Sequence, residues 1–310
     1  MGAGKLETGI IFLLQTGVGI LGNSSLLCFY NISFFIGHKL RSTDLILNQL
    51  AFANSLVLFF KGMPQTIVAF GWKDFLDDVG CKLAIYWCRV GMAVSLNTIC
   101  LLNGFQLIKL NPGIWSWMEV KIRSLKFIVF CCFLCWILHI VLNSFIPVLV
   151  SSPRGRQNLS LESNYRYCFW EMPDHYNPLY TVLLYYSPDF WGLAFIMWAS
   201  ISMVILLHRH KKQVQYIHNQ ALSKSRQNHE ARATCTILIL VTSFFAFYSI
   251  YNALAIWTTL TVKTSYWTMN SSVFLSTCFP ALSPFVIIIS DTRISRLCFG
   301  CCLKTKCLFD

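Results

Sequence analysis

Three charged residues, Lys61, Arg89 and Asp189, stand inside long apolar stretches of this sequence. At the centre of a membrane-spanning helix such a charge costs about 2.5–3.5 kcal/mol, and it usually faces the interior of a helix bundle or a water-filled cavity. Arg89 and Asp189 have opposite charges, so we expect both to line one cavity, where they can also pair. A purely structural ion pair and snorkelling of the side chains to lipid headgroups are the alternatives.

Aromatic and amide side chains at similar depths in these stretches are candidates to line the same cavity. They are Tyr185, Tyr248, Tyr251, Asn252 and Phe274. A mostly apolar cavity with a few polar groups suits a small, largely hydrophobic ligand. The aromatic belt at a membrane surface explains several of these residues equally well.

The sequence lacks the motifs that carry covalent or metal chemistry. We find no glycine-rich phosphate loop, His-Glu-x-x-His motif or Gly-x-Ser-x-Gly motif. His208, His210 and His218 lie close together, but basic residues surround them and no cysteine or carboxylate completes a set of metal ligands. We therefore predict a protein that is not an enzyme and that needs no metal ion or cofactor.

The overall composition is that of an integral membrane protein. Of the 310 residues, 55% are hydrophobic and only 12% are charged, whereas average soluble domains have about 25% charged residues. So few charges cannot cover the surface of a water-exposed globule of this length. The chain must therefore bury much of its surface in lipid.

Seven apolar runs are long enough to cross a bilayer as helices, each of which needs about 20 residues. They cover 9–36, 44–70, 81–108, 127–150, 178–207, 233–260 and 266–290. We therefore predict an all-α membrane protein, a seven-transmembrane helix bundle in a single domain over 1–310, with a tail at 291–310. The absence of an internal repeat disfavours an inverted-repeat transporter, and the absence of a filter motif disfavours a channel.

The basic residues predict the orientation of the bundle. They concentrate after the first, third and fifth runs and in the tail, above all between 208 and 232. Because lysine and arginine beside a span are retained on the cytoplasmic side, the amino terminus should lie outside the cell and the carboxy terminus inside. The net charge of +12 then reflects topology and attraction to anionic membrane lipids. We expect no nucleic-acid partner, because no recognition motif accompanies the charge.

Two kinds of modification follow from this topology. Asn158 begins an Asn-Leu-Ser sequon in the long outer segment, where N-glycosylation takes place. Cys298, Cys301 and Cys302 lie beside basic residues soon after the last span, a position that favours palmitoylation. Ordinary reduced thiols and a four-cysteine zinc site that includes Cys307 are the alternatives for the tail.

Several segments resemble vomeronasal type-1 receptors, a family of G-protein-coupled receptors. They are LAFANSLVLF at 50–59, CFWEMP at 168–173, HRHKKQVQYIH at 208–218, EARAT at 230–234 and CFPALSPFV at 278–286. The resemblance covers nearly the whole chain, and the segment that begins at His208 is the most specific. It implies a plasma-membrane receptor for a small pheromone-like ligand, whose partner is a heterotrimeric G protein of the inhibitory type.

The resemblance also implies roles for particular residues. Cys81 and Cys168 should form a disulfide that ties the outer segment to the third helix. From their charges rather than from the resemblance, Arg209, Lys211 and Lys212 are expected to anchor the fifth helix at the inner membrane surface and to present a contact surface for the G protein. A bitter-taste receptor is the main alternative, because its architecture is similar.

The sequence departs from the larger rhodopsin-like group at its switch motifs. Asn103-Gly-Phe-Gln stands where that group has Asp-Arg-Tyr, and Asn54 replaces the aspartate of the second helix. The seventh helix has Ser283-Pro284 in place of Asn-Pro, and it contains no lysine for a retinal Schiff base. The activation switches and the sodium pocket of the larger group are therefore not transferred to this chain.

Overall fold

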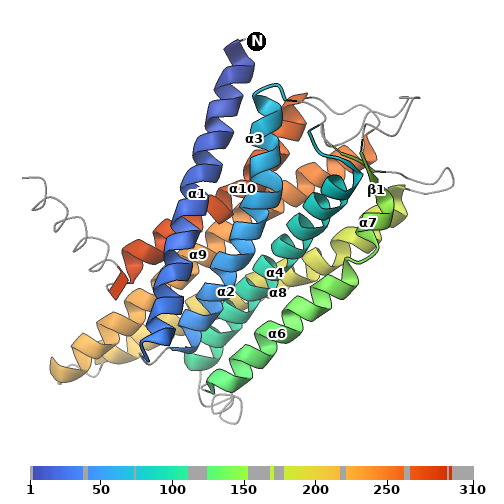
Figure 1. Cartoon of the computed structure of the whole chain (residues 1–310). Helices are drawn as coiled ribbons and strands as arrows, with labels where there is room; N and C mark the ends of the chain where they lie inside the picture. The colour runs from blue at the N-terminus through green and yellow to red at the C-terminus, as the bar shows by residue number, and fades with distance from the viewer. Residues whose placement is uncertain are drawn as a thin grey trace, which may run out of the picture.

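The computed structural model describes residues 3–37, 41–72, 75–110, 124–152, 168–170, 178–216, 221–261, 266–291 and 293–294. These residues form, in order, α1 (Ala3–Phe35), α2 (Ser42–Val57), η1 (Leu58–Gly62), α3 (Met63–Ala69), α4 (Asp78–Leu110), α6 (Leu125–Leu142), α7 (Ile146–Leu149), β1 (Val150–Ser151), β2 (Phe169–Trp170), α8 (Pro178–Tyr216), α9 (Ala221–Leu260) and α10 (Tyr266–Ser290). Within them, seven helical segments are long and apolar enough to cross a membrane. The all-α seven-span fold expected from the sequence is confirmed (Figure 1).

The helix α4 is the centre of the bundle. It is the most buried of the seven segments and packs against α2, α6, α8 and α9. The least buried segment is α6, which lies at the edge of the bundle in Figure 1. Side chains on α4 therefore face several helices at once, which suits this helix to carry a central polar site.

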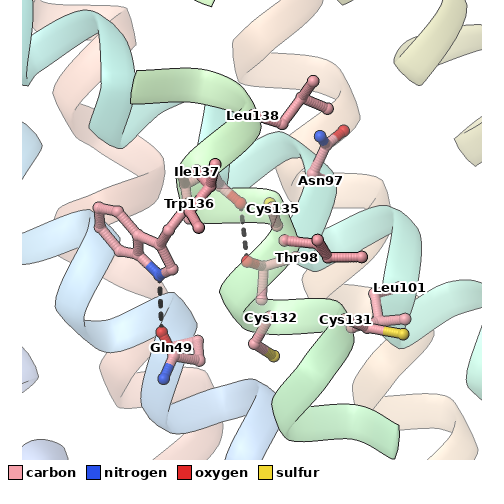
Figure 2. Close-up of a pocket in the computed structure, with 12 residues that line it drawn as sticks. Gln49, Asn97, Thr98, Leu101, Cys131, Cys132, Cys135, Trp136, Ile137 and Leu138 are labelled. Carbon is pink, nitrogen blue, oxygen red and sulfur yellow. Dashed lines mark hydrogen bonds between the residues drawn. The ribbon is translucent and has the colours of Figure 1, made fainter. Parts of the chain in front are cut away.

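A shallow groove of about 450 Å³ opens on the outer surface of the bundle between α2, α4 and α6 (Figure 2). Its walls are mostly apolar, and at one side the Trp136 indole N–H donates a hydrogen bond of 2.8 Å to the Gln49 side-chain oxygen. None of the residues predicted to bind a ligand lines this groove. The groove is therefore separate from the site described below.

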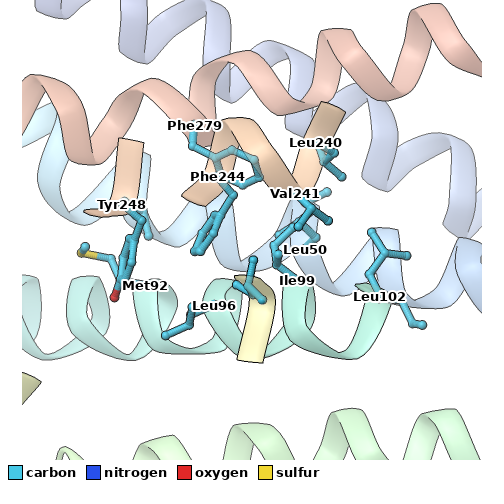
Figure 3. Packing of buried hydrophobic residues seen from close by; sticks show 14 of the residues in the cluster. Leu50, Met92, Leu96, Ile99, Leu102, Leu240, Val241, Phe244, Tyr248 and Phe279 are labelled. Carbon is cyan, nitrogen blue, oxygen red and sulfur yellow. The ribbon is translucent and has the colours of Figure 1, made fainter. Parts of the chain in front are cut away.

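The apolar core lies where α4 meets α2, α9 and α10 (Figure 3). Met92, Leu96 and Ile99 repeat at helical spacing on α4 and form its buried stripe. On α9, Phe244 stacks on Tyr248 with ring centroids 5.0 Å apart and meets Phe279 of α10 edge to face at 4.8 Å. These aromatic contacts join the core to Tyr248, one of the residues predicted to line the site.

Small residues allow α1 to approach α10 closely. A Cβ atom added at Gly19 would lie 2.9 Å from the Ala281 Cα atom, and one added at Gly22 would lie 2.8 Å from the Pro284 Cγ atom. In lipid, where apolar side chains gain little by leaving the solvent, such close packing drives helix association.

A hydrogen bond fastens the same interface. Pro284 has no N–H to donate to the Pro280 carbonyl one turn earlier, and the Asn23 side-chain amide of α1 donates to that carbonyl at 2.8 Å. The unpaired helical carbonyl therefore finds a partner inside the protein, as the bilayer interior requires.

At the end of the bundle where α4 begins, a disulfide joins Cys81 to Cys168, with the Cα atoms 5.6 Å apart. This is the pair that the resemblance implied. Cys168 directly precedes β2, and β2 pairs antiparallel with β1, which places Val150 opposite Trp170. Both sulfurs belong to fully buried residues, so the bridge holds Cys168 and the adjoining strand β2 onto α4.

The helices α8 and α9 continue beyond the apolar runs from which they were predicted. The α8 backbone is helical as far as Tyr216, and α9 already begins at Ala221. Lysine, arginine and glutamine are good helix formers, so the polar composition of this segment does not end either helix. Residues Arg209, Lys211 and Lys212 consequently lie on helical backbone.

Candidate functional site

Arg89 of α4 and Asp189 of α8 form a buried ion pair. The Arg89 Nη1 atom lies 2.8 Å from Asp189 Oδ2, and Nη2 lies 3.0 Å from Oδ1, so the pair is bidentate. The two side chains are only 5% and 2% exposed. Snorkelling to the headgroups does not describe this geometry, because each charge is neutralised inside the bundle.

Two tyrosines complete this cluster. The Tyr248 hydroxyl of α9 donates to Asp189 Oδ2 at 3.1 Å and accepts a longer hydrogen bond of 3.4 Å from Arg89 Nη1. The Arg89 guanidinium carbon lies 4.3 Å from the centre of the Tyr185 ring, and Nη2 donates to the Tyr185 carbonyl at 2.9 Å. Three helices, α4, α8 and α9, therefore meet at one charged centre.

A proline lies beside the carboxylate of this centre. Pro188 lies inside α8, immediately before Asp189. Proline has no N–H for the backbone hydrogen bond to the preceding turn, which contains Tyr185. The Tyr185 carbonyl in that turn accepts a hydrogen bond from Arg89, so backbone and carboxylate bind the same guanidinium.

Lys61 is a second buried cation. It lies outside the set of ligand-binding residues predicted from the sequence. It lies in the π-helical turn η1, which directly precedes α3 and its Pro64. Pro64 has no N–H to donate to the Phe60 carbonyl one turn earlier. The Lys61 side chain is 2% exposed, and Nζ lies 4.3 Å from the centre of the Tyr251 ring. The sequence shows that Lys61 is a charged residue inside an apolar stretch, but it does not show that the side chain points into the bundle.

Asn252 and Phe274 have different surroundings from the charged cluster. Asn252 is 3% exposed, and among the described residues neither its side-chain oxygen nor its nitrogen has a hydrogen-bond partner. Phe274 is 37% exposed and lies edge to face against Phe12 of α1, with ring centroids 6.4 Å apart. Phe274 therefore packs against α1, whereas the charged cluster around Arg89 lies where α4, α8 and α9 meet.

Deeper in the bundle, Asn54 joins three helices through neutral groups. Its side-chain oxygen accepts a hydrogen bond of 2.8 Å from Ser95 of α4, and its nitrogen donates at 2.9 Å to Ser283 of α10. An amide and two hydroxyls take the place of the carboxylate that a sodium site would use. The residues at this position thus form a structural connection between α2, α4 and α10.

Comparison with known proteins assigns the chain to a family. Residues 6–300 match the family model described as the vomeronasal organ pheromone receptor family. The chain belongs to the vomeronasal type-1 receptor family. It is 58% identical to vomeronasal type-1 receptor 1 of Homo sapiens over 301 residues, which cover 97% of this chain and 85% of that relative.

The chain also matches more distant relatives. The chain is 40% identical to vomeronasal type-1 receptor 3 of Homo sapiens, over 97% of this chain and 96% of that receptor. It is 30% identical to olfactory receptor class A-like protein 1 of Danio rerio, over 92% of this chain and 90% of that protein. The family is one of seven-span receptors, so the receptor fold and the chemosensory function expected from the sequence are confirmed.

In this vomeronasal-type receptor a second polar cluster lies at the other end of the bundle. Arg293, just beyond α10, pairs with Asp44 of α2 through hydrogen bonds of 2.8 and 3.2 Å, and with Asp291 at 2.8 Å. Hydrogen bonds to Asp44 and Asp291 raise the pKa of the Arg293 guanidinium above its usual value, so Arg293 stays charged. A cavity of about 380 Å³ adjoins the pair, and α2, α4, α9 and α10 contribute to its wall.

Other predicted site residues of the receptor are only partly described. Arg209 is exposed on α8, and the side chains of Lys211 and Lys212 lie outside the described residues, as do Asn158, Cys298, Cys301 and Cys302. Among the residues that the structure does describe, no three histidine, cysteine, aspartate or glutamate side chains are grouped as a metal site would require.

Proposed function

We propose that this receptor binds a small, largely apolar, pheromone-like ligand in the half of the bundle that contains Arg89, and that binding activates an inhibitory-type heterotrimeric G protein at the opposite end. The buried cluster of Arg89, Asp189 and Tyr248 carries this proposal. It brings a few charged and polar groups from three helices together beside the apolar core, and binding sites for small molecules combine apolar walls with a few such groups. Tyr185, Tyr251 and Asn252 are the further residues proposed to contact the ligand.

The packing below the cluster supports a link between the two ends. Tyr248 hydrogen-bonds to Asp189 and stacks on Phe244, which in turn contacts Phe279 beside Pro280 of α10. A ligand that binds one arrangement of these helices more tightly than another shifts the population toward that arrangement. We propose that the favoured arrangement opens the cavity beside Arg293 to the G protein, with Arg209, Lys211 and Lys212 as its contacts.

The proposed orientation follows from charge. We place the amino terminus outside the cell, and the basic residues around Lys211 and the tail in the cytoplasm. In this position they also meet the anionic lipids of the inner leaflet. Palmitoylation of Cys298, Cys301 or Cys302 would fasten the tail to the same surface.

A ligand-panel screen tests the proposed function. Cells expressing the receptor at the surface, together with reporters for inhibitory and for stimulatory G proteins, are exposed to volatile, steroid and bitter compounds. We expect a response to volatile or steroid compounds through the inhibitory reporter. A response to bitter alkaloids alone would favour the taste-receptor alternative, and ligand-evoked current without any G protein would favour a channel.

We predict that Asn158 carries an N-linked glycan, because its sequon lies in the segment placed outside the cell. The Asn158→Gln receptor should migrate faster on a denaturing gel than the wild type, and glycosidase treatment should remove the difference. Asn23→Gln is a matched control, since Asn23 also begins a sequon but is buried in α1. Unchanged migration of the Asn158→Gln receptor would contradict the prediction.

A further inference from the structure

The buried charges in the Arg89 half of the bundle do not cancel. Arg89 and Asp189 neutralise each other through two short hydrogen bonds. Lys61 is as deeply buried as this pair, yet no described carboxylate lies within ion-pair distance of its Nζ atom. When Lys61 is protonated, Arg89, Asp189 and Lys61 together carry one net positive charge inside the bundle.

The tyrosine beneath Lys61 does not compensate for this charge. A cation over an aromatic face is stabilised by the ring when both are desolvated, and the distance of 4.3 Å from Nζ to the Tyr251 ring suits that interaction. Removing an ion from water costs more than this gain even after the protein relaxes. The Lys61 ammonium also has three N–H donors, and a single aromatic face does not satisfy them.

The bundle contains further buried donors without acceptors, together with unpaired acceptors such as the Asn252 side-chain oxygen. Among the described residues, Arg89 Nε and the Asn270 side-chain nitrogen have no hydrogen-bond partner. The Asn270 side-chain oxygen is already occupied, because Gln65, one turn after Lys61, donates to it at 3.0 Å. An anionic acceptor beside Lys61 and Arg89 would satisfy the unpaired Arg89 Nε donor and compensate the Lys61 charge together.

We propose that Lys61 binds an anionic group of the ligand, so that the receptor recognises a small amphiphile with an apolar body and one carboxylate-like group. This inference rests on the proposed ligand-binding function and names the chemical class of the ligand. The π-helical turn at Leu58–Gly62 and the ring of Tyr251 hold the ammonium in place. Chloride from solution carries the same charge, and the experiment separates these two sources.

The test uses the purified full-length receptor in lipid nanodiscs and measures its melting temperature. The probes are medium-chain carboxylic acids with straight, branched and cyclic skeletons, each beside the alcohol and the methyl ester of the same skeleton. The variants are Lys61→Gln and Lys61→Arg. Lys82→Gln is the matched control, because Lys82 is an exposed lysine on α4 that pairs with Asp78 at 2.6 Å.

We expect at least one acid to raise the melting temperature of the wild type while its ester and alcohol have no effect. Lys61→Gln should weaken the apparent affinity for that acid by about tenfold or more, Lys61→Arg should retain most of it, and Lys82→Gln should match the wild type. Without any ligand, Lys61→Gln should melt at a higher temperature than the wild type, because it removes an uncompensated buried charge.

Two results would overturn the inference. The first is that acids stabilise the wild type no more than their esters, or stabilise Lys61→Gln equally. The second is that replacing chloride with gluconate lowers the melting temperature of the wild type but not of Lys61→Gln while no acid has an effect, since the anion would then be a solution ion. Acid binding that needs Lys61 but activates no G protein would instead refute the proposed function alone.

Discussion

Replacing Asp189 with asparagine should destabilise the receptor by about 3–5 kcal/mol, because removing one partner of a buried ion pair leaves the other charge uncompensated. The Arg89 guanidinium would keep the Tyr185 carbonyl, but the asparagine amide can accept only one of the two hydrogen bonds that the carboxylate accepts and carries no charge. The measurement is thermal unfolding of the purified variant in lipid nanodiscs, together with its amount at the cell surface.

Two further variants show whether the loss belongs to the pair. Asp78→Asn, at an exposed aspartate paired with Lys82, should change stability little because exposed ion pairs contribute little. The double variant Arg89→Met with Asp189→Leu removes both charges and should recover much of the stability. If Asp189→Asn alone unfolds at the wild-type temperature, the pair does not hold α4 to α8.

Replacing Cys81 with serine should cost about 2–5 kcal/mol, because the disulfide to Cys168 restricts a long stretch of the unfolded chain. The bridge spans 87 residues of sequence and fastens β2 to the first turns of α4. Thermal unfolding without reductant, and mass spectrometry of non-reduced peptides, measure the loss and the pairing.

Cys88→Ser is the matched control for this change. Cys88 is a buried cysteine on the same helix, with a free thiol, so its replacement should leave the disulfide intact. The double variant at Cys81 and Cys168 should unfold like either single variant, because each removes the same bond. Recovery of both cysteines as free thiols from folded wild-type receptor would contradict the pairing.

The fold could be predicted from the sequence because the bilayer imposes strong conditions on the chain. Each span needs a long apolar run, and the run that contains Arg89 remains recognisable because it has few charges. The same rule identified Arg89 and Asp189 as site candidates, since a charge inside such a run needs a partner or a cavity. The structure brings these two together, while the role of the pair in ligand binding stays a prediction.

The face of a helix on which a side chain lies was harder to predict than the depth of that residue in the membrane. Phe274 was predicted to line the ligand cavity from its depth alone. In the structure it packs against the Phe12 ring of α1. Lys61 was recognised as a charge within a span, but it lies buried in a π-helical turn that hydrophobic periodicity does not reveal. Contacts such as that between Asn23 and the Pro280 carbonyl join residues 257 positions apart and follow only from the packed bundle.

We propose that the half of the bundle containing Arg89 faces the outside of the cell while the basic segment around Lys211 faces the G protein. The most direct measurement inserts an epitope tag beside Lys211 and compares antibody binding in intact and in permeabilised cells. We predict that the antibody binds only after permeabilisation, while a tag at the amino terminus is bound in intact cells. Binding to the Lys211 tag on intact cells would contradict the account, because the basic residues proposed to contact the G protein would then lie outside the cell.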